Sequence, residues 1–334
     1  MSPSSDRRDR GARIAVIGAT TPDGSRVRER LAGLGIPGSR VDLYGATRGE
    51  AVISEYAGEA RLIQEPEPSE TADHEVIFLC EAGKAASEAA AGAPADSVVV
   101  DVVGALEGEE RPPVVHMDIN PELARDRRGR LAVPHPVALL LVELLEPLER
   151  KFGLREAVAI LLRPAADFGE AGVEELRQQT VQLLSFSELP QETFGRQLAF
   201  NIIPQVVLEN DSQSLAEEVS SDVARLLCWR RGLLTMRVLV APVFYGHCLQ
   251  LHVRLGKETS LAEVREALSD HPFSYSASEG GETTPMDVSG EKRTNLYSVE
   301  EDGLGGFWLL AVAGELGEGQ AEQAVRMADS AYGL

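Results

Sequence analysis

The sequence is poor in cysteine and in positive charge, and it has no long apolar run. Its three cysteines, Cys80, Cys228 and Cys248, are an odd number and lack the spacing of metal ligands. This pattern excludes a disulfide framework and a zinc site, so we expect no metal. Reduced thiols are typical of the cytosol, and we therefore expect a cytoplasmic protein.

Lysine and arginine number 32 against 53 aspartate and glutamate residues, which gives a formal net charge of -21. Such a chain repels phosphate backbones and anionic lipid headgroups, so we expect neither nucleic acid nor a membrane as a partner. No apolar run approaches the roughly 20 residues that span a bilayer. The N-terminal residues 1–11 are polar and charged, and they are predicted to be a disordered lead.

The first third of the chain alternates strand and helix patterns. An apolar run at residues 14–17 is followed by a glycine turn at 18–24 and a helical pattern. Further strands are predicted at "VDLYGA", "EVIFLC" and "SVVVDVV". This order predicts an α/β domain with a doubly wound parallel sheet of the Rossmann type over residues 12–135. The apolar face of residues 318–333 predicts a final helix that completes this domain.

The pattern changes after residue 135. "EAVAILLRPA", "MRVLVAPVFYGHCLQLHVRL" and "FWLLAVAG" are typical of strands, whereas "GVEELRQQTVQLL" and "LAEVREAL" are typical of amphipathic helices. We therefore predict an inserted α+β domain over residues 136–317 with a largely antiparallel sheet. Its acidic, glycine-rich stretch "SASEGGETTPMDVSGEKRT" is predicted to be a flexible surface loop.

Five segments, in this order and at these separations, resemble one family: "IGATTPDG", "DINPE", "AGVEEL", "FGRQLAFNIIP" and "APVFYGH". Over residues 13–331 the chain is similar to the aspartate-semialdehyde dehydrogenase family. "FGRQLAFN" and "PVFYGH" bring it closest to the Usg-like branch, which lacks the catalytic cysteine. The resemblance implies a nucleotide-binding domain, an α+β domain that also forms the dimer, and a cytoplasmic homodimer.

The resemblance also implies a reaction and a position for its nucleophile. In the enzymes a cysteine thiolate attacks the aldehyde, hydride passes to NADP and phosphate resolves the thioester, while a histidine serves as acid and base. That cysteine opens a helix, and the matching position in "LAVPHPVALLL" is Pro136. Proline suits a first helical position because its missing N–H would be unpaired there. We therefore expect a helix but no thioester chemistry, and we interpret His135 as a cap or packing group.

His247 of "PVFYGH" matches the acid/base histidine of the family. If this segment is a strand, the side chains of His247 and Cys248 point to opposite faces, so the two cannot enter one pocket. Two interpretations stay open. His247 is either a vestigial acid/base group or a core histidine held by structural hydrogen bonds.

Other positions that match substrate ligands carry different side chains. The substrate-orienting glutamine falls on Arg163, and the glycines after it become the bulkier residues 166–168. The arginine that pairs with the substrate carboxylate falls on Val240, and the arginine that holds phosphate falls on Glu107. We expect that substrate and phosphate do not bind as in the enzymes, with the alternative that Glu107 simply points to solvent.

The candidate dinucleotide contacts are Gly18, Ala19, Thr20, Thr21, Gly24 and Arg48. Thr21 replaces the glycine that lets the backbone approach the phosphates. Arg48 matches a ligand of the adenosine 2'-phosphate, although a solvated arginine fits it equally well. The asparagine near nicotinamide falls on Glu315, and a basic pair falls on Gly317 and Glu318. We therefore expect NADP binding to be weak or lost.

Functional positions have changed while core and interface segments remain recognisable, so we predict a catalytically silent paralogue that acts by binding or assembly. Two alternatives stay open. One is an active NAD(P)-dependent oxidoreductase on a semialdehyde or another small substrate without cysteine covalent catalysis, supported by His247 and the Gly18 turn. The other is a heteromer with the active paralogue through the shared dimer surface.

Overall fold

The computed structural model describes residues 11–45, 52–65, 71–106, 111–125, 128–208, 214–229, 232–269, 276–277, 284–288 and 294–334. The predicted lead up to residue 10, most of the predicted flexible loop, Arg48 and Glu107 lie outside these residues. The chain divides into two compact units, residues 1–139 with 317–334 and residues 140–316. In the part of the chain that is described, no helix has the length and apolar character needed to cross a membrane.

The first unit is built on a parallel five-stranded sheet in the order β2-β1-β5-β6-β7. Its strands are β1 (Ile14–Ile17), β2 (Val41–Tyr44), β5 (Val76–Leu79), β6 (Val98–Asp101) and β7 (Gly129–Ala132). Every residue of β1, β5 and β6 is buried, because helices cover both faces of the sheet. The strand order reverses between β1 and β5, and their carboxyl ends therefore flank the crevice where such sheets bind ligands.

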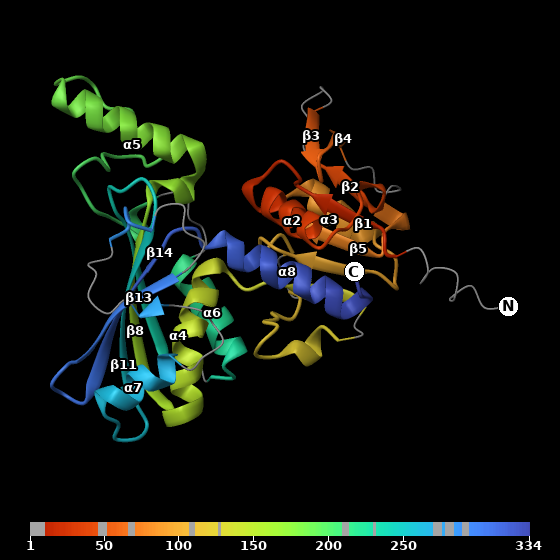
Figure 1. Ribbon diagram of the computed structural model, residues 1–334. Helices are drawn as coiled ribbons and strands as arrows, with labels where there is room; N and C mark the ends of the chain where they lie inside the picture. The colour runs from red at the N-terminus through yellow and green to blue at the C-terminus, as the bar shows by residue number, and fades with distance from the viewer. Residues whose placement is uncertain are drawn as a thin grey trace. The chain divides into compact units, whose positions relative to one another are not determined.

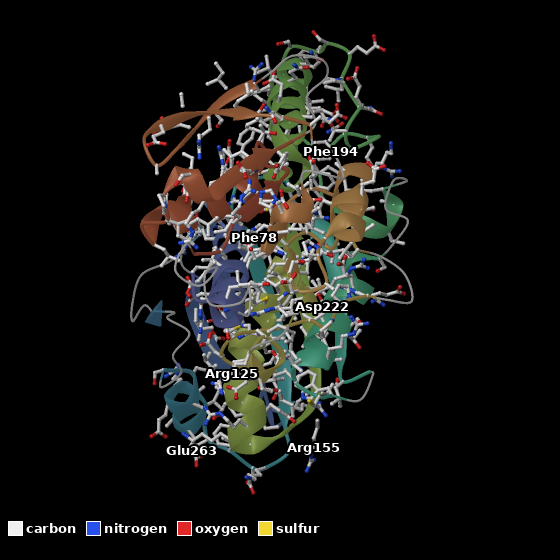
Figure 2. All side chains as sticks on the ribbon, turned by 90° about the vertical axis from the view of Figure 1, so that its right-hand side faces the viewer. Phe78, Arg125, Arg155, Phe194, Asp222 and Glu263 are labelled. Carbon is white, nitrogen blue, oxygen red and sulfur yellow. The ribbon has the colours of Figure 1, made fainter. Side chains whose placement is uncertain are left out.

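Three helices cover this sheet: α2 (Pro22–Gly33), α3 (Lys84–Gly92) and α8 (Gly317–Tyr332). Helices α2 and α8 lie side by side (Figure 1), and their apolar residues share one core with alternate residues of β1 and β5. That core includes Phe78, one of the largest fully buried side chains (Figure 2). The other face packs against the alanines of α3. This is the Rossmann-type architecture that the sequence predicts.

Two features of the first unit differ from the sequence prediction. Helix α2 already begins at Pro22 rather than after Gly24, because Thr21 caps it and proline suits its first position. An antiparallel hairpin of β3 (Val52–Tyr56) and β4 (Glu59–Ile63) follows β2 and was not predicted. Short 3-10 turns, η1 (Gly38–Arg40), η2 (Thr71–Asp73) and η3 (Pro121–Leu123), complete the connections.

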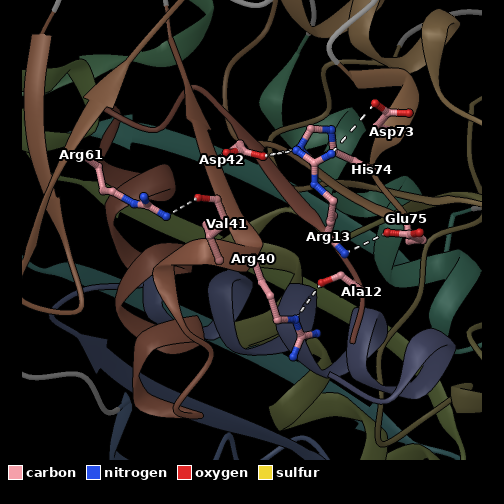
Figure 3. Close-up of polar contacts among 9 residues, drawn as sticks. All are labelled: Ala12, Arg13, Arg40, Val41, Asp42, Arg61, Asp73, His74 and Glu75. Atoms are coloured by element: carbon pink, nitrogen blue, oxygen red, sulfur yellow. Dashed lines mark hydrogen bonds and ion pairs between the residues drawn. The ribbon is translucent and has the colours of Figure 1, made fainter. Parts of the chain in front are cut away.

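Ion pairs tie together the amino ends of the parallel strands (Figure 3). The Asp42 carboxylate of β2 lies 2.9 Å from Nη2 of Arg13, which precedes β1, and 2.9 Å from Nε2 of His74, which precedes β5. The backbone N–H of Arg13 donates to the Glu75 carboxylate at 2.8 Å. These contacts fix the amino ends of the strands, whereas the candidate ligand crevice lies at their carboxyl ends.

The second unit contains a mixed seven-stranded sheet in the order β12-β13-β14-β11-β8-β10-β9. Its strands are β8 (Leu154–Arg163), β9 (Ile203–Pro204), β10 (Leu234–Val240), β11 (His247–Leu255), β12 (Ser276–Ala277), β13 (Thr294–Glu301) and β14 (Gly306–Ala313). The β8–β10 and β12–β13 pairs are parallel and the other four pairs are antiparallel. The largely antiparallel sheet that the sequence predicts is therefore present.

Helices cover one face of this sheet. They are α4 (Pro136–Phe152), α6 (Leu215–Leu226) and α7 (Leu261–Ser269), which lie on the same side of the strands in Figure 1. Buried and more exposed residues alternate along β10 and β11, as expected of a sheet with one covered face. Helix α6 was not predicted from the sequence, although Leu215, Val219, Val223 and Leu226 have helical spacing and are buried.

Helix α5 (Gly169–Leu184) holds the segment that contains "FGRQLAFN". The buried Glu175 carboxylate accepts hydrogen bonds from the N–H groups of Thr193 and Phe194. The buried Gln179 side chain accepts from Leu198 N–H and donates to the carbonyl oxygens of Pro190 and Arg196. Two polar side chains therefore replace the regular backbone pairing that this segment lacks.

Candidate functional site

The glycine turn after β1 is fixed by close backbone contacts. Gly18 has a φ of +81°, and a Cβ there would lie 2.8 Å from the Glu81 backbone N. A Cβ on Gly24 would lie 2.1 Å from the Gly18 carbonyl oxygen. Both glycines are therefore required by the packing of the turn itself, whether or not a ligand binds there.

The amino end of α2 has few N–H groups left for an anion. Pro22 removes the N–H of the first helical position, and the Thr21 hydroxyl accepts from Gly24 N–H at 3.1 Å. The same hydroxyl lies 2.9 Å from the carbonyl oxygens of Gly18 and Cys80, so it bridges the loops after β1 and β5. Helix N-termini bind phosphate through free N–H groups, and here the Thr21 side chain competes for one of them.

Carboxylates surround this crevice. Burial raises the pKa of Asp23, in the first turn of α2, and that of Glu81, which follows β5. Burial also raises the pKa of the Cys80 thiol well above its usual range, and the charges of Asp23, Asp101 and Glu81 raise it further. A carboxylate about 5 Å from a phosphate charge would disfavour its binding by roughly 3 kcal/mol at an effective dielectric of about 20.

Helix α4 begins at Pro136, the position where the resemblance places the nucleophile. His135 Nδ1 accepts from Val137 N–H at 3.2 Å, and the His135 carbonyl accepts from Leu139 N–H. His135 therefore caps the helix through both its side chain and its backbone. A thiolate at such a helix start would be stabilised by the helix dipole, but proline offers no ionisable group.

An arginine, an aspartate and a histidine of the second unit meet at the end of β8. Arg163 is the last residue of β8, and Asp167 lies in the 3-10 turn η4 (Ala165–Phe168). Arg163 Nε donates to Asp167 Oδ2 at 2.8 Å, and His247 Nε2 lies 2.9 Å from Asp167 Oδ1. His247 opens β11, one step beyond the Cys248–Leu162 pair, so the antiparallel register brings His247 beside Arg163.

Electrostatics hold the Asp167 carboxylate in its ionised form. Burial alone would raise the pKa of Asp167, but the charge and hydrogen bond of His247 and those of Arg163 outweigh burial and lower it to about 2. Arg163 also donates to Gln205 Oε1 at 2.9 Å and lies over the Phe168 ring. His247 Nδ1 is buried and has no hydrogen-bond partner among the described residues.

The other predicted positions of this unit are strand neighbours of this group, because Val240 pairs with Arg163 across β10 and β8 and Cys248 follows His247 on β11. Val240 is fully buried in an apolar cluster with Leu176, Phe194 and Leu198. Cys248 is half-buried next to His247 on β11, where successive side chains face opposite sides. Burial raises the pKa of the Cys248 thiol, which is the reverse of what activates a nucleophile.

Sequence reasoning identified Arg163 and His247 but not their common partner. It treated Asp167 only as a replaced glycine, although an arginine and an aspartate four residues apart are a recognisable signal for a local ion pair. Thr21 was identified as a lost glycine but not as a helix cap. Of the predicted positions near the C-terminus, Glu318 in α8 is buried and pairs with Arg30 at 3.5 Å, whereas Glu315, which precedes α8, is exposed. Among the described residues no group of His, Cys, Asp and Glu side chains is arranged to hold a metal ion.

Comparison with known proteins gives concordant matches. The profile of the semialdehyde dehydrogenase dimerisation domain matches residues 145–313. The aspartate-semialdehyde dehydrogenase of Aquifex aeolicus is 26% identical, over 96% of this chain and 97% of the relative. A USG-1 protein homolog of Pseudomonas aeruginosa is 28% identical, over 76% of this chain and 77% of the relative.

Solved structures agree with the fold. A probable aspartate-semialdehyde dehydrogenase from Pseudomonas aeruginosa superposes with a TM-score of 0.83 at 25% identity, and it covers 96% of this chain and 98% of that chain. Aspartate semialdehyde dehydrogenase II from Vibrio cholerae gives a TM-score of 0.83 at 22% identity over the same shares of the two chains. The chain therefore belongs to the semialdehyde dehydrogenase family, and over nearly its whole length it is similar to aspartate-semialdehyde dehydrogenases.

Proposed function

We propose that this chain is a Usg-like paralogue that has lost the phosphate-dependent semialdehyde reaction and acts by binding or assembly as a dimer. The observation that carries the proposal is the start of α4, where Pro136 stands in the nucleophile position. The reaction implied by the family begins with a thiolate, and proline cannot supply one. The buried Cys80 and the half-buried Cys248 do not substitute, because their thiol pKa values are raised.

The acid/base group is engaged elsewhere. His247 Nε2 is bonded to Asp167, whose carboxylate also pairs with Arg163. A histidine that must exchange a proton with substrate needs one ring nitrogen directed at the reacting atom. We therefore favour a structural role for His247, although its position in the sequence matches the family's acid/base residue.

The residues at the β1–α2 turn fit the phosphates of NADP poorly. Pro22 and Thr21 remove two of the N–H groups that a pyrophosphate would use, and the carboxylates of Glu81 and of Asp23, which Arg26 pairs at 3.1 Å, add no positive charge to hold it. NADP would supply hydride chemistry if it bound, and we derive no step through it. The proposal is that binding is weak or lost.

The dimer is supported by the open face of the seven-stranded sheet. Three rows cross it: Thr235–Val158–His252–Trp308, Arg237–Ile160–Gln250–Leu310 and Leu239–Leu162–Cys248–Val312. Because paired residues share a face, these side chains form one surface, opposite the face that α4, α6 and α7 cover, in which apolar residues are interspersed with a few polar ones and Arg237. Ile160 and Trp308 keep 36% and 39% of their area exposed. Large apolar side chains left open to water on such a face favour burial against a second copy.

A second candidate function is favoured by the His247–Asp167 contact of 2.9 Å. A carboxylate that orients an imidazole is also the arrangement of an active general base, so a noncovalent NAD(P)-dependent oxidoreductase stays as the alternative. The two candidates differ in a simple observable. The alternative requires turnover of NAD(P)H with a small carbonyl substrate in the absence of phosphate, and the silent paralogue gives none.

The experiment that tests the preferred function compares Pro136→Cys with Pro136→Ala. Both variants remove the proline, but only the first adds a thiol at the helix start, where the thiol pKa should be lowered. We expect rapid alkylation of residue 136 in Pro136→Cys, measured by peptide mass spectrometry, and no NADPH from either variant with aspartate semialdehyde, phosphate and NADP. Substantial NADPH from Pro136→Cys alone would contradict the proposed loss of substrate and NADP binding, because it would show that only the nucleophile is missing.

A further inference from the structure

A carboxylate of the second unit lies between an arginine and a histidine. Asp167 accepts from Arg163 Nε at 2.8 Å through Oδ2 and contacts His247 Nε2 at 2.9 Å through Oδ1. We propose that Arg163 and His247 form a binding site for a small organic carboxylate, and that Asp167 occupies this site as a built-in ligand. The proposal goes beyond the proposed function, because it concerns what the site binds and not whether the chain catalyses a reaction.

The Arg163 side chain is held by groups other than Asp167, and the backbone of His247 is fixed within a strand. Arg163 Nη1 donates to Gln205 Oε1 at 2.9 Å, and its guanidinium lies 4.9 Å from the centre of the Phe168 ring. His247 belongs to β11, where it pairs with Ala313 of β14. Removal of the Asp167 carboxylate should therefore leave the guanidinium in place, and it would face an empty volume beside the His247 strand position.

The backbone at Asp167 does not depend on its side chain. The preceding residues of η4 are held by backbone hydrogen bonds, from Ala165 N–H to the Val243 carbonyl and from Ala166 N–H to the Phe244 carbonyl. Substitution by alanine keeps these bonds and removes only the carboxylate. The vacated volume matches formate most closely, because formate is a carboxylate without the methylene that tethers it in Asp167.

The first unit offers an internal comparison. Asp42 also lies between an arginine and a histidine, Arg13 and His74 (Figure 3). There, however, the aspartate and arginine side chains are 41% and 49% exposed, whereas those of Asp167 and Arg163 are 22% and 14% exposed. Charge pairs weaken strongly where water reaches them. Once the aspartate side chain is removed, only the site around Asp167 should therefore bind an added carboxylate ion.

The test measures whether formate replaces the missing side chain. We expect Asp167→Ala to melt at a lower temperature than the wild type, and formate at about ten times its dissociation constant to raise the melting temperature by about 3 °C. Sodium chloride at the same ionic strength serves as the salt control. The matched variants are Asp42→Ala, which keeps a buried histidine beside an arginine that is half exposed, and the double variant Arg163→Met/Asp167→Ala, which lacks the guanidinium. Neither should respond to formate beyond the chloride effect.

Each outcome decides the proposal. A formate response confined to Asp167→Ala supports it, and an equal response in the double variant or no response at all overturns it. If Asp167→Ala fails to fold in plain buffer, its yield on refolding with formate or with chloride gives the same readout, and no gain with formate overturns the proposal. None of these results depends on dehydrogenase activity, so failure here leaves the proposed function standing, and failure of that function leaves this site standing.

Discussion

The open face of the seven-stranded sheet should be the dimer interface, and Ile160→Lys tests this assignment. Ile160 lies in the middle of β8, and in the parallel pair its neighbour on β10 is Arg237. A lysine at position 160 would stand beside Arg237 on each copy, and a dimer would bury these two neighbouring cations in both copies. The isolated unit should tolerate the change, because the Ile160 side chain already faces solvent.

The size of the effect follows from desolvation. Burial of the exposed third of an isoleucine contributes roughly 0.5 to 1 kcal/mol per copy. Burial of an unpaired ammonium costs several kcal/mol per copy, and like charge opposite it adds to this. With two copies, the dimer should be weakened by at least roughly 5 kcal/mol, which is more than a thousandfold in the dissociation constant.

Sedimentation velocity at micromolar concentration measures the result. We expect a dimer for the wild type and a monomer for Ile160→Lys. The control is Ile53→Lys on the β3–β4 hairpin of the first unit, where the isoleucine is 74% exposed and lies outside the proposed interface. A dimer that survives Ile160→Lys, or that is lost equally in Ile53→Lys, would refute the assignment.

Three further predictions concern single side chains. Asp167→Asn should remove about 2 kcal/mol of stability, because the pKa of Asp167 is lowered from its ordinary 3.8 to about 2. This contribution is present above pH 4 and is lost as the pH falls toward 2, so the urea midpoints of variant and wild type should converge in acid. A gap between the midpoints that stays constant with pH would argue against it. Glu175→Ala should cost roughly 2 to 4 kcal/mol by urea denaturation, because two N–H groups lose their acceptor; a loss under 1 kcal/mol would mean that water replaces the carboxylate. Thr21→Gly combined with Asp23→Asn should increase NADP affinity at least tenfold, measured by calorimetry, because the double change frees the Gly24 N–H and removes a negative charge. An unchanged affinity would mean that other residues prevent NADP binding.

Much of the fold was predictable because its signals are local. Apolar runs such as residues 14–17 and 76–79 are fully buried strands, and a glycine turn follows the first strand at Gly18, although it ends earlier than predicted because the helix begins at Pro22. The β3–β4 hairpin was missed because Ile53 and Leu62, which pair across it, are exposed rather than buried, so no apolar face marks it. Helix α6 was not predicted, although its buried apolar residues have a clear helical spacing.

The candidate site was predictable in part. Pro136 at a helix start follows from local rules, and the structure shows that helix beginning there. The contact between His247 and Asp167 joins residues 80 positions apart through the pairing of β8 with β11, and no local pattern in a single sequence contains that pairing. The same holds for Thr21, whose hydroxyl reaches the Cys80 carbonyl across the crevice. Long-range pairing, rather than propensity, decides these contacts.

We propose above all that this family member has kept the fold and lost the reaction. The most direct measurement is NADPH formation by the purified wild-type protein with aspartate semialdehyde, phosphate and NADP, at a protein concentration high enough to detect single turnovers. We predict no NADPH above the protein-free background, because no thioester forms at Pro136. Turnover within about a hundredfold of a typical enzyme rate of roughly 10 per second would contradict the account.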